Sequence, residues 1–265
     1  MGTSKAYGSP NWPGVNRAVG SAASGDPTTE KIVKAVGAFA SAYKAYLSSG
    51  IVSPGLGNRS GAAAGRSDRT GVSGLGRGGG SGGASRSRAA SEGSRLANFI
   101  SSAQQSGFQS AVSKFGLDEF VDKPLDEFLD AMANRLSGEG GILDDDVLDK
   151  AMSDTLNELA EKAGTVEEFD KLLSGGLLNI EEVLQSYYAN VLFNHFEQKE
   201  YAIVRKKMSN IETKKFFKEA RSLIRAIVRE ELAVERDLTQ IDWATSDGQQ
   251  IADSINQEVM GILIP

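Results

Sequence analysis

Side chains that commonly carry out catalysis are few in this sequence and form no catalytic pattern. His195 is the only histidine, and it stands among apolar residues in the segment 191–196. A single histidine in such a segment is far more often a packed helix residue than a general base. The sequence has no cysteine, and no serine has a plausible general base beside it. These features predict that the chain is not an enzyme, and they argue against hydrolysis by a catalytic triad.

Two further segments superficially suggest ligand sites. The run Asp144–Asp146 with Asp149 is rich in carboxylates, but Leu148 occupies a ligand position of a calcium loop and the required glycine is absent. Carboxylates at the start of a helix complement its dipole, so a helix N-terminus is the simpler interpretation. The glycines of 74–80 lack the strand and helix that flank a phosphate-binding loop. We therefore predict no metal site and no cofactor.

The first residues offer a different kind of chemistry. Gly2 is small enough that removal of Met1 is expected, which would leave a glycine α-amine. Such an amine has a pKa of about 8, so a fraction is unprotonated and nucleophilic at neutral pH. Behind it, Tyr7, Pro10 and Trp12 form a short stretch whose rings could anchor in a partner's groove. Composition alone favours an ordinary disordered terminus here.

Charge and glycine content divide the chain near residue 92. Residues 1–92 hold 19 of the 30 glycines and carry 11 Lys/Arg against 4 Asp/Glu, whereas residues 93–265 carry 18 against 31. The segment 50–92 has too little apolar content to fold alone, which predicts a disordered linker. Its arginines could contact nucleic acid, but the lack of interleaved aromatic residues favours a plain tether. These arginines are Arg59, Arg66, Arg69, Arg77, Arg86 and Arg88.

Apolar spacing predicts helices wherever the chain can fold. Residues 28–49 carry one helical stripe, and residues 93–265 show helical periodicity with repeated N-cap signals. We therefore predict an all-α protein with a flexible tail at 1–27, an amphipathic helix at 28–49, a disordered linker at 50–92 and a helical domain at 93–265. No apolar run reaches the roughly 18 residues of a membrane span, and no signal peptide is evident, so we expect a cytoplasmic location.

The opening residues resemble those of a known family. Met1-Gly2-Thr3-Ser4, followed by Ala6-Tyr7-Gly8 and Pro10, resembles the start of QatB, the B component of the bacterial Qat anti-phage defence system. The Gly/Ser-rich front and acidic helical body are also similar in style. The resemblance implies operon partners: a KAP-type ATPase, a TatD-like nuclease and a QueC-like enzyme of 7-deazaguanine chemistry. QueC-like enzymes adenylate a carboxylated deazaguanine and pass the activated carboxyl group to an amine.

The resemblance and the reactive terminus together suggest a function. Our hypothesis is a non-enzymatic adaptor or scaffold whose Gly2 amine accepts a 7-deazaguanine-type base from the QueC-like partner. The residues that would bind this partner are Thr3, Ser4, Tyr7, Pro10 and Trp12. The alternative is a nucleic-acid-binding adaptor that uses the arginines of segment 50–92.

Overall fold

The structure is a computed structural model that describes residues 11–24, 27–49, 81–137, 145–176, 178–231, 238 and 241–263. The described part of the chain is helical and contains no strand, which confirms the all-α prediction. Its elements are α1 (Trp12–Ala22), α2 (Thr29–Ser49), α3 (Ser81–Ser106), α4 (Phe108–Phe115), the 3-10 turn η1 (Asp118–Phe120), α5 (Leu125–Ser137), α6 (Asp145–Ala160), α7 (Val166–Ser174), α8 (Ile180–Arg205), α9 (Asn210–Glu231) and α10 (Ser246–Ile262).

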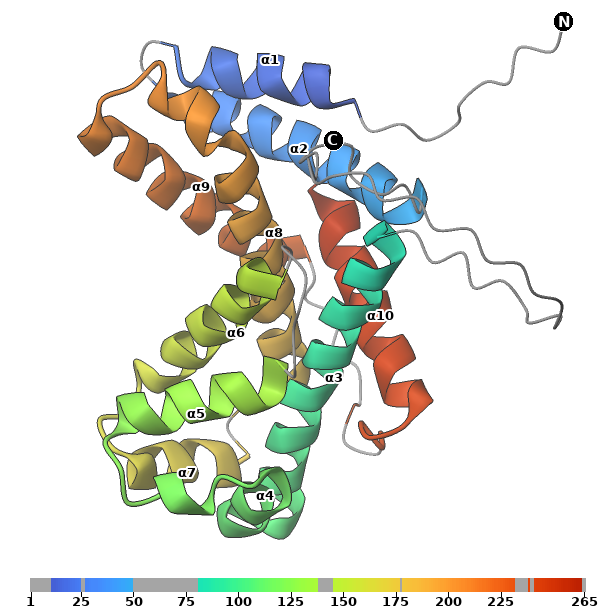
Figure 1. Cartoon of the computed structure of the whole chain (residues 1–265), viewed down its shortest axis with the longest axis vertical. Helices are drawn as coiled ribbons and strands as arrows, with labels where there is room; N and C mark the ends of the chain where they lie inside the picture. Colours follow the sequence, from blue (N-terminus) through green and yellow to red (C-terminus); the bar gives the residue numbers. More distant parts are fainter. Residues whose placement is uncertain are drawn as a thin grey trace, which may run out of the picture.

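Helix α8 is the central element of the fold. It contacts α1, α3, α6, α9 and α10, and buried residues occur on all sides of it from Ile180 to Val204. Figure 1 shows α8 running through the molecule, with α1, α2 and α9 at one end and α4, α5 and α7 at the other. Because a helix that is buried around most of its circumference must be covered by others, α8 organises the core.

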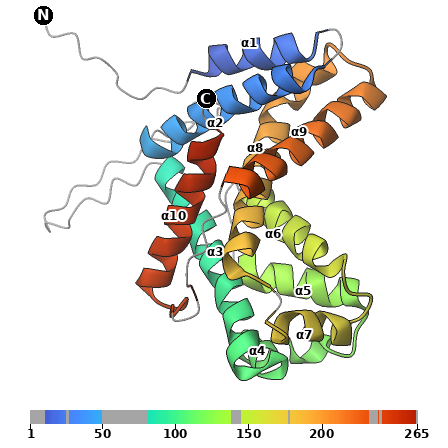
Figure 2. The same cartoon turned by 180° about the vertical axis from the view of Figure 1, so that it is seen from behind.

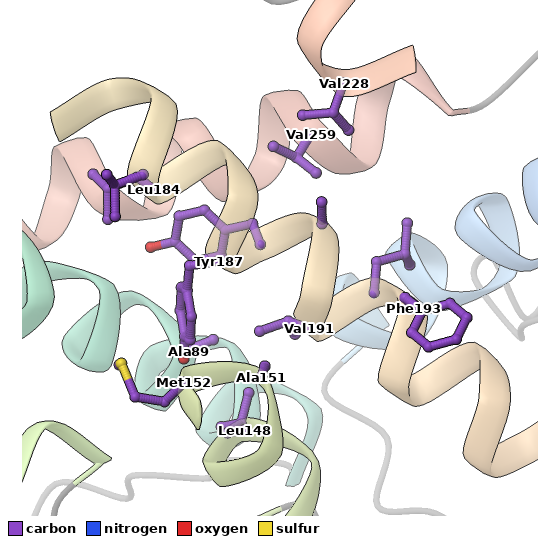
Figure 3. Close-up of a cluster of buried hydrophobic side chains, with 14 of the residues drawn as sticks. Ala89, Leu148, Ala151, Met152, Leu184, Tyr187, Val191, Phe193, Val228 and Val259 are labelled. Atoms are coloured by element: carbon purple, nitrogen blue, oxygen red, sulfur yellow. The ribbon is translucent and has the colours of Figure 1, made fainter. Parts of the chain in front are cut away.

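The core is made where several helices meet on α8. Figure 3 shows Leu184, Tyr187 and Val191 of α8 among buried side chains from four other helices. These neighbours are Ala89 of α3, Leu148, Ala151 and Met152 of α6, Val228 of α9 and Val259 of α10. The predicted helical domain therefore has one packed hydrophobic core.

Several helices start at a residue whose side chain caps the first turn. The Thr165 hydroxyl accepts a hydrogen bond from the Glu168 backbone N–H at 3.3 Å, and the Asn179 side chain accepts one from Glu181 at 2.8 Å. Gly107, with φ 86°, separates α3 from α4. A positive φ is a conformation that glycine adopts readily and that ends a helix.

The prediction of a flexible tail at 1–27 is wrong for the part that the structure describes. Residues 12–22 form α1, and Val15, Val19 and Ala22 are buried where α1 packs along α2. Proline near the start of a helix is favourable, since its missing N–H has no partner in the first turn anyway. Residues 1–10 lie outside the described residues.

The predicted linker at 50–92 also ends earlier than expected. Helix α3 begins at Ser81, and Ala89, Ala90 and Glu92 are buried, whereas residues 50–80 lie outside the described residues. Small side chains in this stretch pack closely against other helices instead of remaining solvated. The amphipathic helix expected at 28–49 is confirmed as α2, which packs on α3, α8, α9 and α10. Within the described residues, no helix has both the length and the apolar character of a membrane span.

Candidate functional site at the root of the N-terminal arm

We call residues 1–10 the N-terminal arm and the point where it joins α1 the arm root. At the arm root, the Asn11 side chain accepts a hydrogen bond from the Gly14 backbone N–H at 3.1 Å, and Pro13 lies in the first turn. Both features favour the start of a helix at this point. The helix therefore begins directly behind the arm, and Trp12 is its first residue.

The Trp12 side chain ties the arm root to two other helices. Its ring lies 5.9 Å from the ring of Phe39 in α2, and the Lys199 ammonium of α8 lies 4.2 Å from its centroid. The same ammonium lies 5.2 Å from the centroid of the Tyr46 ring. A cation above two aromatic faces is held by the negative charge density of both rings. Trp12 is half-buried here, so its aromatic surface is used within the chain.

The other end of α1 has its own attachment to the body. The Lys207 ammonium, just beyond α8, donates hydrogen bonds to the Gly20 carbonyl and the Ser24 hydroxyl, both at 2.8 Å. Charge-assisted hydrogen bonds of this kind are stronger than neutral ones. Helix α1 is thus held near both ends by lysines, Lys199 within α8 and Lys207 just beyond it, as well as along its apolar face.

His195 lies beneath the arm root and is a packing residue. It is 1% exposed, and its ring centroid lies 4.6 Å from that of Tyr43 in α2. Neither ring nitrogen has a hydrogen-bond partner among the described residues. Burial, and to a smaller extent the charge of Lys199, lowers the pKa of His195 to about 3. The imidazole is therefore neutral at physiological pH, and the prediction of a packed histidine is confirmed.

A network around the buried Glu92 carboxylate joins α3 to α6 and α8. The Arg88 guanidinium donates to the Glu92 carboxylate at 2.6 Å and to Asp149 of α6 at 3.2 Å. The Tyr187 hydroxyl of α8 donates to Glu92 at 2.9 Å. Burial outweighs these stabilising contacts and raises the pKa of Glu92 to about 7. The assignment of Arg88 to a disordered linker is wrong, because this arginine belongs to α3 and joins it to α6.

The remaining predicted residues fall outside the described part of the structure. These are Gly2, Thr3, Ser4, Tyr7 and Pro10 of the arm, and Arg59, Arg66, Arg69 and Arg77. Arg86 belongs to α3, but its side chain is not among those described. Helix α6 begins at Asp145, within the acidic run, and no group of three or more potential metal ligands occurs among the described residues.

The residues that hold α1 to the body and form the Glu92 network were not predicted from the sequence. Lys199, Lys207 and Glu92 looked like ordinary charged residues, and only their tertiary neighbours give them a role. A weak signal was available at Val15, Val19 and Ala22, whose spacing of four and three residues is that of a helix face. The glycines and prolines around them obscured it.

Comparison with known protein families decides the relationship of the chain. The family model described as Qat anti-phage system associated protein QatB matches residues 78–263. The chain belongs to the QatB family. It is therefore a component of an anti-phage system. No curated protein and no solved structure matches the chain significantly.

The region matched by the QatB family model corresponds to the helical body of the fold. It begins three residues before α3 and extends through α10, so it covers the helical body around α8. Helices α1 and α2 lie outside the matched region, yet they pack on α3, α8, α9 and α10. The QatB-family body therefore carries an additional helical pair, and this pair fixes where the N-terminal arm begins. Figure 1 shows the pair lying across one end of that body.

Proposed function

We propose that this QatB-family chain is a non-enzymatic adaptor that presents its N-terminal glycine to a QueC-like partner for modification with a 7-deazaguanine-type base. The observation that supports this proposal best is the arm root. Helix α1 is fixed to the body by Trp12 and Lys207, so the residue that follows the arm has a fixed position. A protein substrate needs a reachable terminus and a firm base, and it needs no catalytic residues of its own.

The length of the arm sets a geometric condition on this partner. A fully extended chain covers at most about 3.3–3.6 Å per residue. The nine residues from Gly2 to Pro10 can therefore reach roughly 30 Å from the arm root. The partner's reactive centre must come within that distance of Trp12 when the complex forms. An arm of this length can enter an active-site cleft while the body remains outside.

The proposed reaction is amide formation at the terminus. After removal of Met1, the Gly2 amine nitrogen attacks the acyl carbon of the adenylated deazaguanine carboxylate. An amide bond forms, AMP leaves, and the amine gives up a proton to solvent or to a base of the partner. The partner supplies activation and catalysis, which is consistent with the buried and neutral state of His195 in this chain.

Within the arm, Thr3, Ser4, Tyr7 and Pro10 are the proposed contacts to the QueC-like enzyme. Trp12 was expected to join them, but its ring packs against Phe39 and Lys199. We therefore assign Trp12 to positioning the arm. The KAP-type ATPase and the TatD-like nuclease are proposed as further partners, and the cytoplasm as the site of assembly. The rival is a nucleic-acid role of the Arg-bearing segment, of which one member, Arg88, is engaged in ion pairs within the chain.

The test is the mass of the N-terminal peptide. The protein is purified from cells that express it alone and from cells that also express the neighbouring genes. We expect a partner-dependent mass increase on the peptide that begins with Gly2. The variant Gly2→Glu, whose larger second residue should retain Met1, is expected to lack the increase, whereas Ser9→Ala in the same arm should keep it. An unmodified Gly2 in cells where phage protection works would contradict the proposal.

A further inference from the structure

A second feature of the body is a hollow on the α8–α9 hairpin. It has a volume of about 360 Å³ and lies between α8 and α9, where Lys150 of α6 also reaches its edge. Figure 2 shows α9 lying along α8, with α6 just below them. A volume of this size falls within the range of about 300–1,000 Å³ that small-molecule sites occupy. We call this hollow the hairpin pocket.

The floor of the hairpin pocket is aromatic. The rings of Phe193, Tyr201 and Phe217 line it. Tyr201 stacks on Phe217 with centroids 5.9 Å apart and an interplanar angle of 18°. Phe217 is buried, whereas Tyr201 is 47% exposed and is one of the few large apolar or aromatic side chains of the described chain that reach solvent. A stacked aromatic pair whose outer member is exposed at a pocket is suited to receive a third flat ring.

Two lysine side chains at the pocket have no acidic partner among the described residues. Lys150 is paired with Asp154 at 3.3 Å and Glu197 at 3.7 Å, and Arg221 is paired with Asp154 at 2.8 Å. Lys214 and Lys218, one helical turn apart on α9, have no ion pair among the described residues, and both line the pocket. Two neighbouring ammonium groups without acidic partners favour an anion carrying about two charges.

A buried hydroxyl at the pocket has no partner within the described residues. Thr213 lines the pocket and is 1% exposed, and its hydroxyl has no hydrogen-bond partner among the described residues. The Nε of Arg221, also at the pocket, likewise lacks an acceptor. Leaving a buried polar group unpaired costs about 1–3 kcal/mol, so such groups normally have partners. A small side-chain rotation would let a ligand in the pocket supply one.

The net charge of the surrounding sequence also favours an anionic ligand. Residues 197–231 carry ten Lys/Arg and six Asp/Glu, whereas residues 93–190 carry seven Lys/Arg and nineteen Asp/Glu. The hairpin is therefore a positively charged region on an acidic body. A field of this sign raises the local concentration of anions.

We propose that the hairpin pocket binds a free nucleotide, with the base stacked on Tyr201 and the phosphates held by Lys214 and Lys218. The aromatic face accounts for the base, the two unpaired lysines account for the phosphates, and the Thr213 hydroxyl supplies a further hydrogen bond. The size of the hollow favours a mononucleotide over a strand of nucleic acid. This proposal is independent of any modification at Gly2.

Calorimetric titration of the full-length protein with ADP and GDP tests the proposal, with tripolyphosphate and an oligo-dT strand as comparison ligands. We expect the double variant Lys214→Gln/Lys218→Gln to weaken nucleotide binding about tenfold or more. The matched control Lys34→Gln/Lys206→Gln removes two exposed lysines elsewhere and should bind as the unaltered protein does. Thermal unfolding of each variant shows that it is folded.

Two further variants separate base recognition from simple anion binding. Tyr201→Ala is expected to weaken ADP binding several-fold and to leave tripolyphosphate binding unchanged. Thr213→Val, which is close in size, should weaken nucleotide binding without lowering the melting temperature of the free protein. The proposal is overturned if neither nucleotide binds, if tripolyphosphate binds as tightly as ADP, or if the oligonucleotide binds far more tightly than either mononucleotide.

Discussion

The ammonium group of Lys199 lies 4.2 Å from the centroid of the Trp12 ring. This contact joins the first residue of α1 to the central helix α8, across most of the length of the sequence. It lies at the edge of the hydrophobic core and depends on one half-buried ring and one exposed lysine. The position at which the N-terminal arm leaves the body therefore depends on a few side chains, and these can be altered without disturbing the core.

Replacing Trp12 by alanine should detach the start of α1 from the body. The variant loses the packing on Phe39 and the cation–π contact with Lys199, which together should stabilise the docked helix by about 2 kcal/mol. Hydrogen exchange should become faster in residues 12–22 and remain unchanged in the centre of α8. The control Trp12→Phe keeps a ring in place and should show a smaller increase. Equal exchange in Trp12→Ala and the unaltered protein would contradict this role.

The helices of this fold differ in whether the sequence alone predicts where they start. Helices α7 and α8 start where Thr165 and Asn179 supply caps, and such local signals are visible in the sequence. Helix α1 is short and rich in Gly and Ala, so its stability depends on the surface of α2 and α8. The arm root could not be predicted, because the pairing of Trp12 with Lys199 depends on how distant helices pack.

The Glu92 carboxyl should make stability depend on pH near neutrality. Its pKa is about 7 in the folded chain and about 4.5 when unfolded, so the stabilisation is fully present below pH 4.5 and is lost as the pH rises through 7. The difference amounts to about 3 kcal/mol. We expect Glu92→Gln, which resembles the protonated form, to flatten the decline measured by urea unfolding. Glu161→Gln, at an exposed position, should leave it unchanged.

A second buried carboxyl group, that of Glu200, should also lower stability as the pH rises. Its effect must be measured separately from that of Glu92. Burial raises the pKa of Glu200 to about 7. The Glu92→Gln variant should therefore retain part of the decline, and Glu92→Gln/Glu200→Gln should lose most of it. If the single Glu92 variant declines with pH as steeply as the unaltered protein, the carboxyl group of Glu92 is ionised in the folded state.

His195 should produce the opposite dependence on the acid side. Its pKa falls from 6.5 to about 3 on folding, so its contribution is present above pH 6.5 and is lost as the pH falls toward 3. Between about pH 6.5 and pH 5 the loss should be about 2 kcal/mol. His195→Met fills similar space without a titrating group, so unfolding of this variant should lack that loss. The variant should also retain phage protection, because we assign the imidazole no chemical role.

The path of α3 could be predicted only in part, for a reason visible at Gly93. The stretch 81–92 resembles a flexible linker in composition, but it belongs to a helix that lies close to α8. A Cβ atom at Gly93 would lie 2.3 Å from the Tyr188 hydroxyl and 3.0 Å from its ring carbon. Gly93, the first residue after the predicted linker, therefore allows close packing of two helices. A composition-based prediction cannot distinguish these two uses of glycine.

This interpretation predicts opposite outcomes for two glycine substitutions. Gly93→Ala should destabilise the protein by about 2 kcal/mol, because Tyr188 is fully buried and its ring cannot move away easily. Gly261→Ala meets only the Lys44 ammonium at 3.7 Å, and it should stabilise α10 by about 0.5–1 kcal/mol through helix propensity. The Tyr188 hydroxyl has no hydrogen-bond partner among the described residues, so Gly93→Ala/Tyr188→Phe should recover part of the lost stability. Urea unfolding of the four proteins measures these differences, and a Gly93→Ala variant as stable as Gly261→Ala would show that α3 and α8 do not approach at this position.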